Sequence, residues 1–299
     1  MPGTLRDFVS RHRLVVNIAL WLVAIAVTGA ALMWQDQTGP TYPLRGTVQT
    51  AKGAVNFEFL RSETIGTDLK VLLLDPVPAG VTAQVRYRRY TSNDVWRTLP
   101  LAKGTFEFSR RGSTTKVAGM GAELPSLKER AGKYEYFVDI DDGSGKPFSV
   151  TGDKAILARY KGDVPMMVLA IHILVIFLAM LLAVRTTLEA LIDGDYNWML
   201  WATLIAFFLG AFVLGPLVQW YAFRVWWSGF PFGGDWTDNK VVVELLAWVV
   251  AVVMNLGKRR NRWVVVGAGL VTLAVYFIPH SIFGSEYSYS GAKSRGTAG

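Results

Sequence analysis

The stretch Val164–Val184 reads VPMMVLAIHILVIFLAMLLAV and contains no Asp, Glu, Lys or Arg. A bilayer core about 30 Å thick needs roughly 20 helical residues to cross it, so this length and composition predict a transmembrane helix. Comparable apolar stretches cover residues 14–34, 198–218, 240–256 and 263–283. We therefore predict five transmembrane helices, the last four of which form a bundle within residues 163–286.

Composition supports a membrane protein. Hydrophobic residues make up 52% of the 299 positions and charged residues only 18%, which would leave a soluble chain with an excess of exposed apolar surface. The chain has no cysteine, which excludes disulfides, thiolate metal sites and thiol nucleophiles. Its net charge of +8 comes from scattered basic residues and from clusters beside helices, which fits membrane orientation rather than nucleic-acid binding.

The basic clusters predict the orientation. Arg11 and Arg13 precede the first apolar stretch, and residues 258–262 place Lys and Arg between the fourth and fifth. Cytoplasmic segments are enriched in these residues, so we expect residues 1–13 in the cytoplasm and the C-terminus outside. The apolar run at 14–34 is longer than the core of a signal peptide, which favours an uncleaved anchor. We expect a bacterial cytoplasmic (inner) membrane.

Residues 35–162 predict a folded domain outside the cytoplasm. Val55, Phe57 and Phe59 alternate with polar neighbours, and Val85 and Tyr87 alternate with arginines, as in half-buried strands. Turn-forming residues recur at short spacing between such stretches. The pattern predicts an antiparallel β-sandwich inserted between the first two membrane helices, and hence an α+β membrane protein.

The run from Leu124 to Val138, LPSLKERAGKYEYFV, resembles the tyrosine corner of fibronectin type III and immunoglobulin-like domains. In those domains a tyrosine hydroxyl holds the loop where the chain crosses between sheets. The resemblance implies a structural role for Tyr134 or Tyr136 and an immunoglobulin-like arrangement of strands. It implies no activity, because such domains serve many functions.

Three ionisable side chains, His172, Glu244 and His280, lie in or at the edge of the apolar stretches, toward the same membrane face. Such residues are costly in hydrocarbon and are often functional. Lys240 lies one helical turn from Glu244, so we expect the two to pair. The same layer contains further polar candidates, namely Arg224, Asp235, Asp238, Asn239 and Glu286.

Several chemistries are compatible with this layer. His172 and His280 can ligate a haem b, or the histidines can bind a transition metal together with Asp235, Asp238, Glu244 or Glu286. Glu244 and the histidines can instead relay protons. In a purely structural alternative, Lys240 neutralises Glu244 and the histidines bond to helix backbones. The cofactor stays unassigned, and no cofactor is the simplest expectation.

The external domain lacks catalytic groups in its sequence. It has no histidine, and its acidic residues are interspersed with basic ones, as on a solvated face. Arg86, Arg88, Arg89 and Arg97 can form a basic face for a partner or can pair with acids across strands. We therefore expect an accessory, assembly or scaffold subunit that binds a partner complex, with a metal- or haem-dependent membrane enzyme or electron-transfer protein as the alternative. Residues 287–299 predict a disordered tail.

Overall fold

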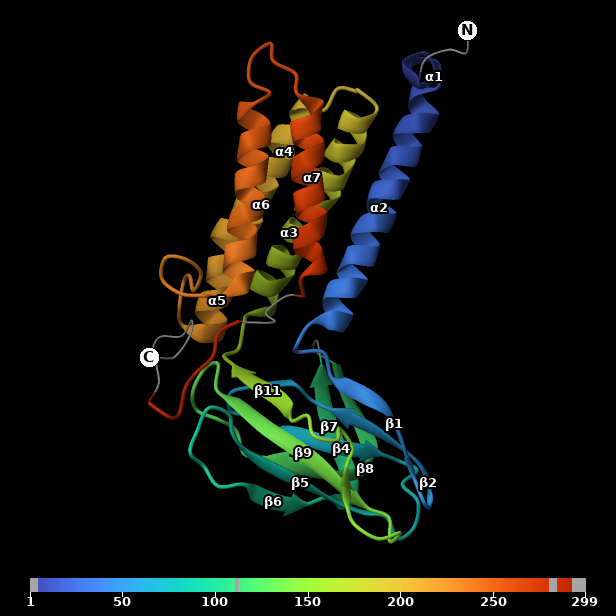
Figure 1. The fold of residues 1–299 in the computed structure, drawn as a ribbon, viewed down its shortest axis with the longest axis vertical. Coiled ribbons are helices and arrows are strands. Elements are labelled where there is room, and N and C mark those ends of the chain that lie inside the picture. Colours follow the sequence, from blue (N-terminus) through green and yellow to red (C-terminus); the bar gives the residue numbers. More distant parts are fainter. Residues whose placement is uncertain (1–4, 111–112, 280–283, 292–299) are drawn as a thin grey trace. The chain divides into compact units, whose positions relative to one another are not determined.

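The computed structural model describes residues 5–110, 113–279 and 284–291. The chain divides into two compact units, which we call the helical unit and the β unit (Figure 1). The helical unit comprises Met1–Gly39 and Val164–Gly284, and the β unit comprises Pro40–Asp163 and Ser285–Gly299. The α+β class predicted from the sequence is confirmed.

The helical unit contains helices that run side by side (Figure 1). Their bounds are α1 Leu5–Arg11, α2 Arg13–Thr38, α3 Met166–Leu191, α4 Asn197–Phe207, a π-helix η1 Phe208–Leu214, α5 Gly215–Phe223, α6 Trp236–Val253 and α7 Arg262–Phe277. Three of the described helical segments are long and apolar enough to cross a membrane, namely Arg13–Thr38, Met166–Leu191 and Asn197–Phe223. They make a membrane protein the natural interpretation.

The other two predicted spans do not meet these criteria of length and apolar composition. Helix α6 carries Asp238, Lys240 and Glu244 in its first half, and α7 is a shorter apolar helix. Helix α7 ends at Phe277, before the boundary at 283 that the sequence predicted, because Pro279 disfavours helical geometry at the residue before it. Ile278 is accordingly extended, with ψ 116°. His280 lies outside the described residues.

A buried arginine ties α2 to α3. Arg185, whose side chain is only 3% exposed, pairs with Glu189 at 2.6 Å on the same helix, the i,i+4 spacing that favours such pairs. It also donates to Asn17 Oδ1 of α2 at 2.7 Å, and its guanidinium lies over the ring of Trp21. The charge is thereby matched by Glu189, although Nε has no hydrogen-bond partner among the described residues.

The β unit consists of two sheets. Its strands are β1 Leu44–Thr50, β2 Gly53–Phe59, β3 Ser62–Thr64, β4 Leu69–Leu74, β5 Thr82–Arg89, β6 Arg97–Pro100, β7 Ala102–Arg110, β8 Ser113–Leu124, β9 Lys133–Asp141, β10 Phe148–Ser149 and β11 Ile156–Lys161. One sheet has the order β1-β2-β4-β8-β7 and the other β3-β11-β9-β5-β6, with β10 paired to β9. All pairings are antiparallel among the described residues except that of β3 with β11.

The two sheets share one hydrophobic core. Val55 and Phe59 of β2 are fully buried in it, together with Val85 of β5 from the other sheet. Their polar neighbours point away, as the period-two alternation predicted. The strand pattern thus fixes which face of β5 is left for Arg86 and Arg88.

Two tyrosine hydroxyls fasten loops to this core. Tyr134 donates to the carbonyl oxygen of Pro125 at 3.0 Å, and Tyr136 donates to that of Leu60 at 2.7 Å. The Tyr134 contact lies within the run that resembles a tyrosine corner and gives this residue the structural role that the resemblance implied.

The residues after α7 return to the β unit. Glu286 pairs with Lys133 at 2.5 Å, and the backbone N–H of Tyr287 donates to the carbonyl of Ala131 at 3.1 Å. The backbone N–H of Tyr289 donates to the carbonyl of Thr91 at 3.1 Å. The sequence predicted disorder from residue 287 onwards, but residues 287–291 are attached here by main-chain and aromatic contacts.

Candidate functional site

His172 bonds to the helix backbone. Its Nδ1 lies 3.1 Å from the carbonyl oxygen of Gly210 in η1. A carbonyl oxygen can only accept, so Nδ1 carries the hydrogen. The backbone N–H of Gly215 donates to the same oxygen, five residues on, as the π-helix requires. This arrangement matches the structural role that the sequence left open for His172.

Asp238 organises the loop between α5 and α6. Its Oδ2 accepts hydrogen bonds from the backbone N–H groups of Ser228 at 2.7 Å and Gly229 at 2.9 Å. The same oxygen accepts from the hydroxyl of Ser228 at 3.0 Å and from the amide of Gln219 at 3.1 Å. These donors all bind Oδ2, so Asp238 serves as a loop anchor in this structure.

The neighbouring polar candidates also make local backbone contacts. Asp235 caps the N-terminus of α6 by accepting from a backbone N–H two residues on, at 2.8 Å. Asn239 accepts from the backbone N–H of Phe230 at 2.7 Å. Arg224 ends α5 in the left-handed conformation, with its guanidinium over the ring of Trp220. The polar composition of this loop is thus explained by its own turn geometry.

Lys240 does not form the expected ion pair with Glu244 among the described residues. Its ammonium group instead donates to the carbonyl oxygen of Ile278 at 2.8 Å. The amide of Gln35 donates to the same oxygen at 3.1 Å, and the indole N–H of Trp34 donates to that of Phe277 at 3.1 Å. The last carbonyls of a helix lack partners within the helix, and α7 obtains them here from α2 and α6.

Glu244 is left in the interior of the helical unit. The residue is only 2% exposed, and its Oε1 has no hydrogen-bond partner among the described residues. The hydroxyl of Thr272 on α7 is the neighbouring hydrogen-bonding group, and that hydroxyl itself accepts from the indole N–H of Trp248 at 2.9 Å.

The predicted ligands are divided between the two units of the chain. Glu286 belongs to the β unit, where it pairs with Lys133, whereas His172, Asp238 and Glu244 belong to the helical unit. Within the part of the chain that the structure describes, no three His, Asp or Glu side chains converge in a way that could hold a metal ion. His280, the second proposed haem ligand, lies outside that part.

The β unit presents a different candidate site, which sequence reasoning identified only in part. We call it the arginine–tryptophan face and define it by Arg86, Arg88, Trp96 and Phe137, with the exposed Val95 at its edge. Two of its arginines point outward from β5 and pair with acids of the adjacent β9: Arg86 with Asp139, and Arg88 with Glu135 at 2.6 Å. Antiparallel pairing of β5 with β9 brings these partners side by side.

Aromatic rings hold the same arginines from the other side. The guanidinium of Arg86 lies 5.1 Å from the ring centre of Phe137, and that of Arg88 lies 4.5 Å from the ring centre of Trp96. The rings of Trp96 and Phe137 are themselves 5.6 Å apart. Cation–π contacts and ion pairs together restrict side chains that would otherwise be free, so the face is rigid before any partner arrives.

Arg89 is neutralised locally at the edge of this face. Its Nε and Nη2 donate to the two carboxylate oxygens of Asp94 at 2.7 and 2.8 Å. These bonds favour the carboxylate of Asp94 and the guanidinium of Arg89 over their neutral forms. They therefore lower the pKa of Asp94 and raise that of Arg89. The pair closes the turn between β5 and β6 and positions Val95 and Trp96.

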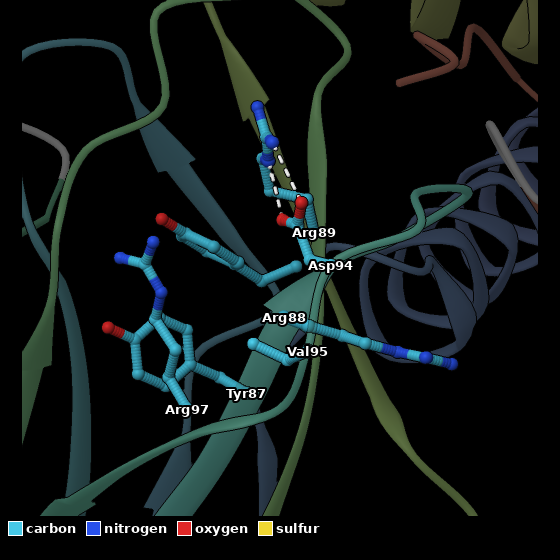
Figure 2. Close-up of a pocket in the computed structure, with 7 residues that line it drawn as sticks. Tyr87, Arg88, Arg89, Asp94, Val95 and Arg97 are labelled. Atoms are coloured by element: carbon cyan, nitrogen blue, oxygen red, sulfur yellow. Dashed lines mark hydrogen bonds and ion pairs between the residues drawn. The ribbon is translucent and has the colours of Figure 1, made fainter. Parts of the chain in front are cut away.

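Arg97 projects from the opposite side of the sheet to Arg86 and Arg88, because the register of β5 and β6 pairs it with the buried Tyr87. It forms no ion pair with a described carboxylate, although its charge helps to lower the pKa of Asp94. It helps line a hollow of about 290 Å³ together with Tyr87, Arg88, Arg89, Asp94, Val95 and Tyr134. Figure 2 shows the guanidinium of Arg97 on the side of the Tyr87 hydroxyl, while Arg89 is turned toward Asp94 and Arg88 points away. Burial raises the pKa of Tyr134 to about 12, so its hydroxyl stays neutral at physiological pH.

Apolar side chains lie exposed next to Arg97. Val95 is 80% exposed and Trp96 is 37% exposed, although both precede an ordered strand. Strand β6 itself is at the edge of its sheet and pairs only with β5. A partner that reaches this edge of the sheet therefore meets the exposed Val95 and Trp96, with Arg97 on the other side of the sheet.

Comparisons of the chain with known protein families, with characterised proteins and with solved structures find no match.

Proposed function

We propose that this protein is a membrane-anchored accessory subunit whose β unit binds a partner protein through the arginine–tryptophan face. The observation that carries the proposal is the exposure of Val95 and Trp96 beside an edge strand, where Trp96 packs against the guanidinium of Arg88 and Val95 lines the hollow that contains Arg97. Tryptophan and arginine are enriched among the residues that dominate binding energy at protein interfaces. A partner with an acidic side chain flanked by apolar groups is complementary to this surface.

The rigidity of the surrounding arginines supports binding rather than catalysis. Arg86, Arg88 and Arg89 are all held by carboxylates, so they shape the surface without adding net positive charge. The hollow beside Arg97 contains a single carboxylate, that of Asp94, which is already engaged. Such a site offers recognition of one anionic group but no acid–base pair for chemistry.

The membrane topology that accompanies this function is also a proposal. We infer five spans, with an immunoglobulin-like sandwich outside a bacterial inner membrane. The chain leaves the β unit into α3 and rejoins it after α7, which supports four crossings between these points. The Tyr134–Pro125 contact supports the immunoglobulin-like arrangement, and the basic residues 258–262 support a cytoplasmic α6–α7 link.

The lack of cysteine makes this topology simple to test. Single cysteines placed at Asp153 in the β unit and at Lys258 in the α6–α7 link would be the only thiols in the chain. We expect a membrane-impermeant maleimide to label the first in intact spheroplasts and the second only after lysis. Labelling of both positions in intact spheroplasts would contradict the proposed topology.

Partner binding is tested by placing a photo-crosslinking amino acid at Val95 of the full-length protein in its native membrane. We expect one protein to be captured in good yield, and the yield to fall about tenfold or more in Arg97→Ala, the loss of roughly 1.4 kcal/mol of binding free energy. Lys103→Ala, an exposed cation on β7 of the other sheet, is the matched control and should leave the yield unchanged. Capture of lipid alone, or equal loss in both variants, would refute the proposal.

A further inference from the structure

Glu244 is a buried carboxyl group that neither the fold nor the proposed partner binding explains. It lies in α6 between neighbouring helices, and its Oε1 has no hydrogen-bond partner among the described residues. Carboxyl groups of helix caps and loops in the same unit, such as Asp235 and Asp238, are satisfied by backbone donors. The unpartnered oxygen therefore needs a separate explanation.

Lys240 is the one cation that acts on Glu244 among the described residues, and it does so without forming an ion pair. On its own helix, Lys240 is engaged by the carbonyl of Ile278. From α7 it meets Thr272 and Tyr276, and the phenol of Tyr276 donates toward the carbonyl of Ile176 at 3.4 Å. Helix α4, which packs against α6, contains no charged residue.

Ionised carboxylates are strongly disfavoured in such surroundings. Transfer of a charge from water to a medium of low dielectric costs far more than transfer of a neutral carboxylic acid, unless a counter-ion and several hydrogen bonds compensate. Glu244 has one neighbouring hydroxyl and no ion pair in the described chain. The neutral acid is the form that these surroundings accommodate.

We propose that Glu244 is a proton-binding site within the helical unit. The reaction is the reversible addition of one proton to the carboxylate, which gives a neutral acid and requires no other reactant. Three polar groups meet near the C-terminal end of α7: the ammonium group of Lys240 from α6, the amide of Gln35 from α2 and the carbonyl of Ile278. They lie between this site and the end of the helices. They mark the route by which the proton enters and leaves. The proposal does not depend on the partner-binding function.

Infrared spectroscopy of the purified full-length protein in lipid nanodiscs tests the protonation state directly. We expect the carbonyl band of a protonated carboxylic acid at neutral pH, present in wild type and absent in Glu244→Gln. Glu189→Gln is the matched control, because Glu189 is paired with Arg185 and should contribute a carboxylate band only. Loss of a carboxylate band instead of an acid band in Glu244→Gln would overturn the proposal.

Labelling by dicyclohexylcarbodiimide keeps the test valid if Glu244→Gln fails to fold. This apolar reagent reacts with protonated carboxyl groups in membranes, and peptide mapping of wild-type protein should find the adduct at Glu244 and not at Glu189. Lys240→Met should leave the yield at Glu244 within about twofold. Labelling that occurs only in Lys240→Met would show that the native carboxyl is ionised against Lys240, which would also overturn the proposal.

Discussion

The ammonium group of Lys133 lies 2.5 Å from the carboxylate of Glu286, a residue 153 positions later in the chain. Lys133 begins strand β9, whereas Glu286 follows helix α7. Both side chains are largely shielded from water, with 11% and 23% of their surfaces exposed. The pair therefore fastens the end of the chain to the β unit.

Breaking this pair should release the C-terminal segment. We expect Glu286→Gln to destabilise the segment's attachment by about 1–3 kcal/mol, because it removes the charge-assisted hydrogen bond between the two shielded side chains. Faster hydrogen exchange at the amides of Tyr287 and Tyr289 would measure the loss. Glu107→Gln, which breaks the exposed Lys116–Glu107 pair, is the control and should change stability by less than about 0.5 kcal/mol. Equal effects of the two variants would contradict the prediction.

Asp142 should make one end of the β unit sensitive to acid. It accepts hydrogen bonds from the backbone N–H of Ala51 at 2.7 Å and from Ser144, and these donors lower its pKa to about 2 from the ordinary 3.8. A lowered pKa in the folded state means that the stabilisation is complete above about pH 4 and is lost as the pH falls toward 2.

Hydrogen exchange at the Ala51 amide tests this dependence. After correction for intrinsic rates, protection should fall across that pH range in wild type and should be low and independent of pH in Asp142→Ala. Asp153→Asn, at an exposed position, should behave like wild type. A wild-type protection factor that stays constant down to pH about 2 would argue against the assignment.

Two buried tyrosines of the β unit should respond differently to loss of their hydroxyls. The hydroxyl of Tyr136 donates to the carbonyl of Leu60, so Tyr136→Phe leaves that buried acceptor unsatisfied and should cost about 1–2 kcal/mol. The hydroxyl of Tyr160 is buried without a well-formed hydrogen bond among the described residues, so Tyr160→Phe should be close to neutral. Urea unfolding of both variants would reveal the difference, and a larger loss in Tyr160→Phe would be inconsistent with these contacts.

Arg185 should be essential for the packing of α2 on α3. Arg185→Leu removes the counter-charge of Glu189 and the donor to Asn17, and we expect it to cost about 3 kcal/mol or more. Asn17→Ala removes only one hydrogen bond and should cost about 1 kcal/mol. Thermal unfolding in mild detergent would rank the two variants, and similar midpoints would contradict this reading.

The strands were predictable because alternation along a strand reports directly which side chains face a core. Val55 and Phe59 are buried as the sequence predicted, and the same pattern left Arg86 and Arg88 outside. The significance of Arg97 was not predictable, because it depends on which acids the register of β5 places beside the other arginines.

The membrane-layer candidates show where sequence reasoning fails. Counting residues along a helix estimates how deep a side chain lies but not where it points. Asp238 points into its own loop rather than toward Glu244. Lys240 was expected to pair within its helix, but Pro279 exposes a helix end whose carbonyls bind it instead. Tyr287 and Tyr289 were a usable signal against a disordered tail, because aromatic residues are scarce in disordered segments.

The Lys133–Glu286 pair also sets an order of events during synthesis. A ribosome adds Glu286 only after every described helix has been made, so the β unit begun at Pro40 receives this contact after all of those helices. Formation of the pair therefore requires that the intervening helices have brought Glu286 back to the β unit. A chain in which one of those helices is misplaced would leave the Lys133–Glu286 pair unformed, and proteases that degrade misassembled proteins can recognise such a β unit.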